Sequence, residues 1–111
     1  MQSRATAKYV RVSSIKAKRV ADLIRGKNIH DAINICRLTN NKPSRAFEKV
    51  LHSALANAQN NQYLDGDDMF VLEAHANQGP TMKRMKAKSR GRGTIYHKRS
   101  SHLSVVLEER N

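Results

Sequence analysis

Three stretches of the chain have apolar residues three and four positions apart, the spacing that places them on one face of an α-helix. The first lies between Ser13 and Gly26. Ser13 or Ser14 can cap its amino terminus through a hydroxyl, and Gly26 can end it in a left-handed conformation. The second covers Asp31 to Leu38, and the third begins near Pro43, whose missing N–H is not needed in a first helical turn. The third has the longest apolar stripe and is expected to form the centre of the core: Phe47, Val50, Leu51, Ala54, Leu55 and Ala58.

Alternating polar and apolar residues predict three strands, at Lys8–Val12, Met69–Ala76 and His102–Leu107. The stretch "NNQYLDGDD" before the second of these is rich in turn formers. Three helices packed on one face of a small antiparallel three-stranded sheet would bury all the apolar stripes, so the predicted fold class is α+β. The chain of 111 residues contains no repeat or linker and is expected to form a single domain.

The segment between the last two strands, "GPTMKRMKAKSRGRGTIYHKRSSH" (Gly79 to His102), contains eight basic residues and no acidic one. Antiparallel pairing of the flanking strands would make it a long β-hairpin that protrudes from a globular body formed by residues 1–78 and 103–111. Its turn is expected near Ser89, Gly91 and Gly93. Arms of about a dozen residues, at about 3.3 Å per residue, would place the tip roughly 40 Å from the sheet. Because the hairpin has too few apolar residues for a core of its own, we expect an anionic partner to order it.

The charge distribution indicates a polyanion as that partner. The net charge is +12, six basic residues precede the first acid, Asp22, and no acid occurs between Glu73 and Glu108. Two acid-free blocks at opposite ends of the sequence suggest two parts of one binding surface. Lys and Arg displace condensed counterions from nucleic acid, and the forked donors of Arg fit phosphate oxygens. The candidate RNA-binding residues are Arg4, Lys8, Arg11, Lys16, Lys18 and Arg25 in the body and Lys83, Arg84, Lys86, Lys88, Arg90, Arg92, Lys98 and Arg99 in the hairpin.

The class of nucleic acid follows from what the sequence lacks. Zinc-finger spacing, basic-zipper heptads and the aromatic ribonucleoprotein motif are all missing. The first predicted helix has few base-reading side chains besides Lys and Arg, which favours recognition of backbone and shape, and therefore structured RNA. A basic DNA-binding architectural protein is the alternative. A solvated basic loop is the simplest reading of the hairpin segment, but long structureless loops are uncommon in compact domains unless they are functional.

Metal binding is not expected. The five histidines are scattered, and His97 and His102 have no cysteine nearby to complete a zinc site. The acids around Gly66 resemble a calcium loop, but its closing glutamate is replaced by Ala76, so a turn is the better interpretation. These acids are Asp65, Asp67 and Asp68.

Catalytic and membrane functions are also not expected. Cys36, the lone cysteine, lies on an apolar helical face and is predicted to be a core residue instead of a nucleophile. The sequence therefore predicts no enzyme, no cofactor and no small-molecule substrate. No apolar run is long enough to span a membrane, and the basic hairpin lacks the apolar bulk of a membrane-surface peptide.

Four stretches of sequence point to a protein family far more specifically than a basic composition does. They are "KAKRVADLIRGK" (Lys16–Lys27), "ALANAQNN" (Ala54–Asn61), "GPTMKRMKAKSRGR" (Gly79–Arg92) and "KRSSHLSVV" (Lys98–Val106). Together with the capped helix, the helix begun by proline and the hairpin, they make nearly the whole chain similar to the large-subunit ribosomal protein twenty-two family, in its bacterial type.

The resemblance implies an α+β body on the outer surface of the large ribosomal subunit and a hairpin threaded through rRNA to the wall of the nascent-peptide exit tunnel. It implies that the protein binds and bridges large-subunit (23S-type) rRNA during assembly, next to other ribosomal proteins. The location would be cytoplasmic, with an organellar ribosome as the alternative. Met82, Lys83 and Arg84 match a hairpin-base motif linked to the macrolide response.

The resemblance implies that the hairpin tip faces the tunnel and the nascent polypeptide, because it matches the tip region of hairpins in this family. The tip residues are Lys88, Ser89, Arg90, Gly91, Arg92 and Gly93. Relatives commonly have Pro-Arg-Ala before a basic residue and Gly-Arg, whereas this sequence has no proline there and has Gly93 in place of an alanine. Both differences should loosen the turn.

Overall fold

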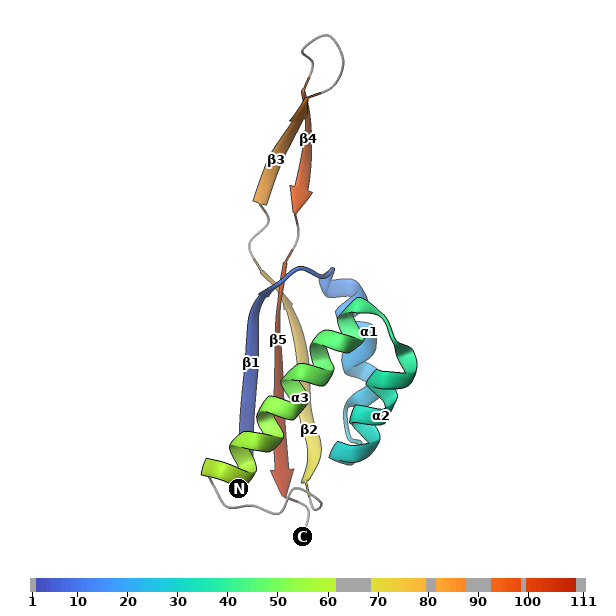
Figure 1. The fold of residues 1–111 in the computed structure, drawn as a ribbon, viewed down its shortest axis with the longest axis vertical. Helices are drawn as coiled ribbons and strands as arrows, with labels where there is room; N and C mark the ends of the chain where they lie inside the picture. Colours follow the sequence, from blue (N-terminus) through green and yellow to red (C-terminus); the bar gives the residue numbers. More distant parts are fainter. Residues whose placement is uncertain (1, 62–68, 80–81, 88–92, 99, 110–111) are drawn as a thin grey trace.

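The computed structural model describes residues 2–61, 69–79, 82–87, 93–98 and 100–109. Three helices and a three-stranded antiparallel sheet form the body, and a separate two-stranded pair extends away from it (Figure 1). The predicted α+β class is therefore confirmed. In chain order the elements are β1 (Gln2–Val10), α1 (Ser14–Ile24), α2 (Ile29–Thr39), α3 (Lys42–Asn61), β2 (Met69–Gln78), β3 (Met82–Ala87), β4 (Gly93–Lys98) and β5 (Ser101–Glu109).

The sheet has the order β1-β5-β2, with β5 antiparallel to both neighbours. All three helices lie on the same face of this sheet, and α3 runs diagonally across it (Figure 1). Along β5, Leu103, Val105 and Leu107 are fully buried, as expected for alternate residues directed toward the helices. None of the described helices lies on the other face of the sheet.

The core lies between the sheet and the helices. Phe47, predicted to be central, is completely buried, and so are Leu51 of α3 and Ile24 of α1. The predicted stripes of all three helices face this core, although Leu55 is only partly buried at its edge. Cys36 is buried as predicted, and burial raises the pKa of its thiol to about 11.

The two ends of α1 differ in how well they follow the prediction. Gly26 has a φ of 82° just after the helix, which confirms the left-handed stop. The backbone beyond it is fixed to the sheet, because the Gly26 N–H donates to the Val71 carbonyl and the Val71 N–H donates to the Lys27 carbonyl. Ser13 occupies the amino-terminal cap position, but its side chain makes no capping hydrogen bond, so the predicted hydroxyl cap is wrong.

The other helices begin with side-chain caps that periodicity alone did not indicate. α2 starts at Ile29 because the Asn28 side chain accepts a hydrogen bond from the His30 N–H at 3.0 Å. At the start of α3, the Ser44 N–H donates to the Asn41 side chain, and the Asn41 N–H donates to the Ser44 hydroxyl, both at 2.8 Å. Pro43 lies in the first turn of α3, as predicted.

The first strand is the largest error in the predicted elements. β1 covers Gln2–Val10, whereas the prediction placed a strand at Lys8–Val12. The pairing of β1 with β5 is irregular between Ala7 and Val10, and Tyr9 there has a φ of 59°. The well-paired part of β1 presents small residues to α3: Ala5 is buried, and the Ser3 hydroxyl donates to the Ala54 carbonyl at 2.7 Å. Small inward residues let α3 approach closely, but they give little alternation of hydrophobicity.

The protruding hairpin is a continuation of β2 and β5. These two strands pair up to Gln78 and Ser101, and β3 and β4 then pair from Met82 opposite Lys98 to Ala87 opposite Gly93. The antiparallel connection predicted for this segment is thus present, and it points away from the helices along the long axis of the molecule (Figure 1). Gly93, expected in the turn, is instead the first residue of β4. Ser89 and Gly91 lie outside the described residues.

Candidate nucleic-acid interface

A basic hollow of about 540 Å³ lies between α1, with the segment that precedes it, and the junction of α2 with α3. Arg11 and Lys16, both predicted to bind RNA, lie there together with Arg19 and Lys42, which the prediction did not include. Among the described residues no acid lines the hollow, α1 has no acid in its first turn, and the Ser13 side chain makes no capping hydrogen bond there. The four cations give the hollow a positive field, which suits an anion such as a phosphate. The amino-terminal ends of α1 and α3 add to this field, and the carboxyl end of α2 at Thr39 opposes it.

The helix-free face of the sheet has a more mixed character. Arg4 lies there in a shallow hollow of about 340 Å³, to which all three strands contribute. The strand pairing places Arg4 and Glu73 on either side of Val106, so Arg4 has an acid in its surroundings. This face is less suited to a polyanion than the hollow at the helix ends.

An exposed aromatic residue lies where the body meets the hairpin. The Tyr9 side chain is 65% exposed, and its ring meets the His102 ring edge to face at a centroid distance of 5.0 Å. The Tyr9 N–H donates to Nδ1 of His102 at 3.1 Å, which helps to hold the unusual backbone conformation. Lys8 and Arg11, two predicted RNA-binding residues, flank this site in the chain and are exposed. The sequence offered one signal for Tyr9, a single aromatic residue between basic neighbours.

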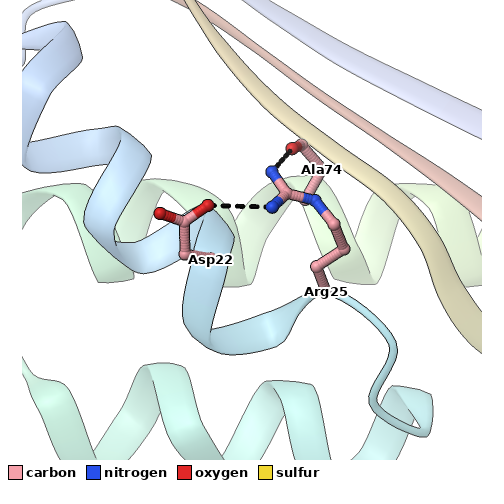
Figure 2. A network of polar contacts seen from close by, with 3 residues as sticks. All are labelled: Asp22, Arg25 and Ala74. Carbon is pink, nitrogen blue, oxygen red and sulfur yellow. Dashed lines mark hydrogen bonds and ion pairs between the residues drawn. The ribbon is translucent and has the colours of Figure 1, made fainter.

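The Arg25 side chain is 43% exposed but is bonded to the body at two points (Figure 2). Its guanidinium donates to the Asp22 carboxylate at 2.8 Å and to the Ala74 carbonyl of β2 at 2.7 Å. These bonds attach the end of α1 to the sheet. Arg25 therefore already has protein partners, although it is exposed like Lys18 on the outer side of α1.

The described strands of the hairpin contain four of the predicted cations, Lys83, Arg84 and Lys86 in β3 and Lys98 in β4. In the six residue pairs between β3 and β4, no basic residue lies opposite an acidic residue. The other predicted hairpin cations, Lys88, Arg90, Arg92 and Arg99, lie outside the described residues, as do the tip residues apart from Gly93.

Other kinds of site receive no support from the described part of the chain. No group of three or more His, Cys, Asp or Glu residues there could hold a metal ion. No described helix is long and apolar enough to cross a membrane. Asp65, Asp67 and Asp68, interpreted as a turn, lie outside the described residues. The acid with a clearly shifted pKa is Glu48, whose pKa is lowered mainly by a hydrogen bond from Arg37.

These features define a class: a small, strongly basic α+β protein with a cationic two-stranded extension and no acid in its main basic hollow. Comparison with known proteins identifies the family. Residues 5–108 match the family described as Ribosomal protein L22p/L17e, and the chain belongs to this family. The predicted resemblance is confirmed, and membership of a family of ribosomal proteins agrees with the prediction that the chain is not an enzyme.

Individual relatives match along their full length. The chain is 49% identical to large ribosomal subunit protein uL22 of Clostridium acetobutylicum over 111 residues, all of both chains. It is 48% identical to the uL22 protein of Halothermothrix orenii, covering 99% of this chain and 97% of the relative. For the uL22 protein of Staphylococcus aureus strain Newman the identity is 45%, with 98% and 93% covered.

Proposed function

We propose that this protein is a structural constituent of the large ribosomal subunit, and that it binds and bridges large-subunit rRNA during assembly. Its family and its full-length relatives, which are large-subunit proteins, support this role. The cytoplasmic location then follows from that of the ribosome. The observation that carries the RNA-binding part is the segregation of charge: the ion pairs of the described residues lie within the body, whereas the pairing of β3 with β4 brings no acid to the hairpin cations.

In the body, the hollow at the ends of α1 and α3 is the proposed site for the RNA backbone. Arg11, Lys16, Arg19 and Lys42 surround it, so a phosphate group there would be neutralised from several sides. Forked donors from the two arginines would fix its orientation. Lys8 and Lys18 extend the cationic surface, and the Tyr9 ring offers a flat surface on which a base can stack. Arg4 and Arg25 remain proposed contacts, although Arg25 is already bonded within the body.

In the hairpin, we propose that the cations neutralise phosphates along both strands and that the tip reaches the wall of the nascent-peptide exit tunnel. A nascent polypeptide would then pass near the tip residues, and neighbouring ribosomal proteins would contact the body. The regular pairing of β2 with β5 from Glu73 to Gln78 gives the hairpin a rigid base, and the Gly79 N–H still donates to the Ser100 carbonyl at 2.9 Å where the body ends.

The hydrogen bond between Gly79 and Ser100 marks where the hairpin can be removed while the paired strands of the body are kept. Residues 80–99 are replaced by Asn-Gly, a sequence that closes a tight turn between paired strands. The variant lacks all eight basic residues of the hairpin and keeps every residue of the core. We expect weaker binding to a large-subunit rRNA fragment and a much smaller dependence of log K on log salt, since each lost phosphate contact removes about 0.7 to 0.9 from the slope.

Two controls accompany this measurement. The thermal unfolding of the variant shows whether the body is intact. Competition between the rRNA fragment and duplex DNA at physiological salt separates the proposal from a DNA-binding architectural protein. An unchanged salt dependence in a folded variant would rule out the proposed role of the hairpin, and a preference for the duplex would favour the DNA alternative.

A further inference from the structure

A groove of about 490 Å³ runs between β1 and α3, on the helix side of the sheet. Its floor consists of small and β-branched apolar side chains, of which Ala5 and Val50 are nearly buried and Ala7, Val10 and Ala46 are half-buried. Polar residues on the α3 side form its rim. The groove therefore has an apolar floor, which suits side chains of a polypeptide better than a fully solvated strand of nucleic acid.

The groove lies beside an open edge of the sheet. β1 pairs only with β5 within the described strands, so its outer edge has no strand partner there. The Arg4 carbonyl points to that edge, because it accepts a hydrogen bond from the Asn57 side chain of α3 at 3.0 Å. Backbone groups of an antiparallel strand alternate between its two edges. Thr6, two residues further on in the same regular register, therefore directs its N–H and carbonyl outward as well.

The rim of the groove is cationic. Lys42, Arg45 and Lys49 of α3 line it, and no acid does. Their spacing along the helix axis, at about 1.5 Å per residue, covers roughly 10 Å. Alternate residues of an extended chain are about 6.6 Å apart, so two acids on the same face of a strand would match two of these cations.

We infer that this groove binds an extended acidic segment of a partner protein, which adds to the sheet as a strand beside β1. The open N–H and carbonyl of Thr6 pair with its backbone. The side chains on its groove-facing side are apolar over the floor and acidic opposite Arg45 and Lys49, because the floor and these cations line the same groove. A phosphate backbone would satisfy the cations, but it would leave the apolar floor and the strand edge without matching groups. This inference goes beyond the proposed function, since it concerns a protein partner on a surface distinct from the hairpin.

The probe is a labelled synthetic peptide of about ten residues, an ordinary strand length. Every second residue faces the groove, and these positions are Val, Glu, Glu, Val and Val in order, with Thr at the positions between them. Binding to the full chain is measured by fluorescence anisotropy. The comparison peptide has the same sequence with N-methyl groups on alternate amides, which keeps the charge and prevents strand pairing. We expect the methylated peptide to bind about tenfold more weakly or worse, which corresponds to about 1.4 kcal/mol.

Three variants of the chain locate the binding. Thr6→Pro removes only an outward N–H donor, and an edge strand tolerates proline at such a position. It should lower the affinity for the peptide about fivefold or more. The double variant R45E/K49E should abolish binding. Lys18→Glu is the control, because Lys18 is exposed on α1 and does not line the groove; it should change the affinity by less than about twofold.

Equal binding of the methylated and unmethylated peptides would overturn the inference, since attraction would then depend on charge alone. So would an rRNA fragment that displaces the peptide from the variant without a hairpin and shifts the Thr6 and Val10 amide resonances, because the groove would then be an RNA site. The variant without a hairpin should bind the peptide as the full chain does. Loss of rRNA affinity and loss of peptide affinity are thus separate results, so that the proposed function and this inference can fail independently.

Discussion

The body and the hairpin are joined through β2 and β5 but are stabilised in different ways. In the body, β2 and β5 bury one face under three helices, and Val71, Ala74 and Val105 are fully buried. In the hairpin, β3 packs mainly against β4. A two-stranded ribbon without a covering layer is at best marginally stable in water. The body thus gives the hairpin its starting point and direction, and we propose that an anionic partner outside the chain keeps the hairpin ordered.

The two regions also differ in how they balance charge. In the body, Arg25 pairs with Asp22, and Arg37 pairs with Glu48, each at 2.8 Å. In the hairpin, the eight basic residues have no acid within their own segment of sequence. Repulsion among them opposes folding of the isolated ribbon and is relieved by a polyanion. The same feature that makes the hairpin weak alone makes its ordering by RNA favourable.

The largest effect expected from this contrast is in amide hydrogen exchange. In the isolated protein, amides of β3 and β4 should exchange at least about a thousandfold faster than the ladder amides at Val105 and Leu107, because opening the hairpin exposes no core. Adding an rRNA fragment should slow exchange in the hairpin strongly and in the body only slightly. Mass spectrometry of peptic fragments measures both regions in one experiment.

Equal protection of hairpin and body in the free protein would contradict this interpretation. It would mean that β3 and β4 are stable without a partner. A fragment of duplex DNA added at the same charge concentration serves as the control for nonspecific screening, and it should protect the hairpin less than the rRNA does.

A smaller effect is expected at Tyr9, where the two regions meet. Its φ of 59° is unfavourable for any residue except glycine, so Tyr9→Gly removes the exposed ring and relieves backbone strain at once. We expect unchanged or slightly higher stability together with a loss of rRNA affinity of about 1 to 3 kcal/mol, the usual contribution of one stacked base. Tyr9→Phe keeps the ring and should bind as the original protein does. If Tyr9→Gly binds rRNA normally, the ring has no part in recognition.

The sequence could predict the helices and the hairpin because their signals are local. Apolar spacing marks the buried face of each helix, and Gly26 marks a stop that needs a positive φ. The segment between β2 and β5 has no apolar periodicity that would support any other element. β1 was misplaced because its inward residues, such as Ser3 and Ala5, are small, and their burial depends on how closely α3 approaches.

The site could be predicted only in part, for a related reason. Charge segregation marked Arg11 and Lys16 correctly as members of a basic region, but Lys42 joins them only because α3 begins beside α1. In the sequence, Arg25 cannot be told apart from the other basic residues near it. Its hydrogen bond to the Ala74 carbonyl forms only because α1 packs on β2. Sequence patterns identify which residues carry charge, whereas the fold decides which of them are free to meet a ligand.

The smallest expected effect tests the charge balance of the body. The Arg37 side chain donates to Glu48 at 2.8 Å, and this hydrogen bond lowers the pKa of Glu48. A carboxyl with a lowered pKa in the folded state stabilises the fold above its ordinary pKa, and that contribution is lost as pH falls through the lowered value. Glu48→Gln should therefore be slightly less stable than the original protein in urea unfolding at neutral pH. The difference should vanish in acid.

The variant without a hairpin sharpens this last comparison. The removed segment contains no acid, so its loss should leave the acid-dependent fall in stability unchanged, and the effect of Glu48→Gln should be the same in both backgrounds. A Glu48→Gln difference that persists in acid would instead mean that the packing of this side chain between α2 and α3 matters more than its charge. If removal of the hairpin changes the fall in stability at acid pH, the cations of the hairpin interact with the acids of the body. The two regions would then not be electrostatically separate.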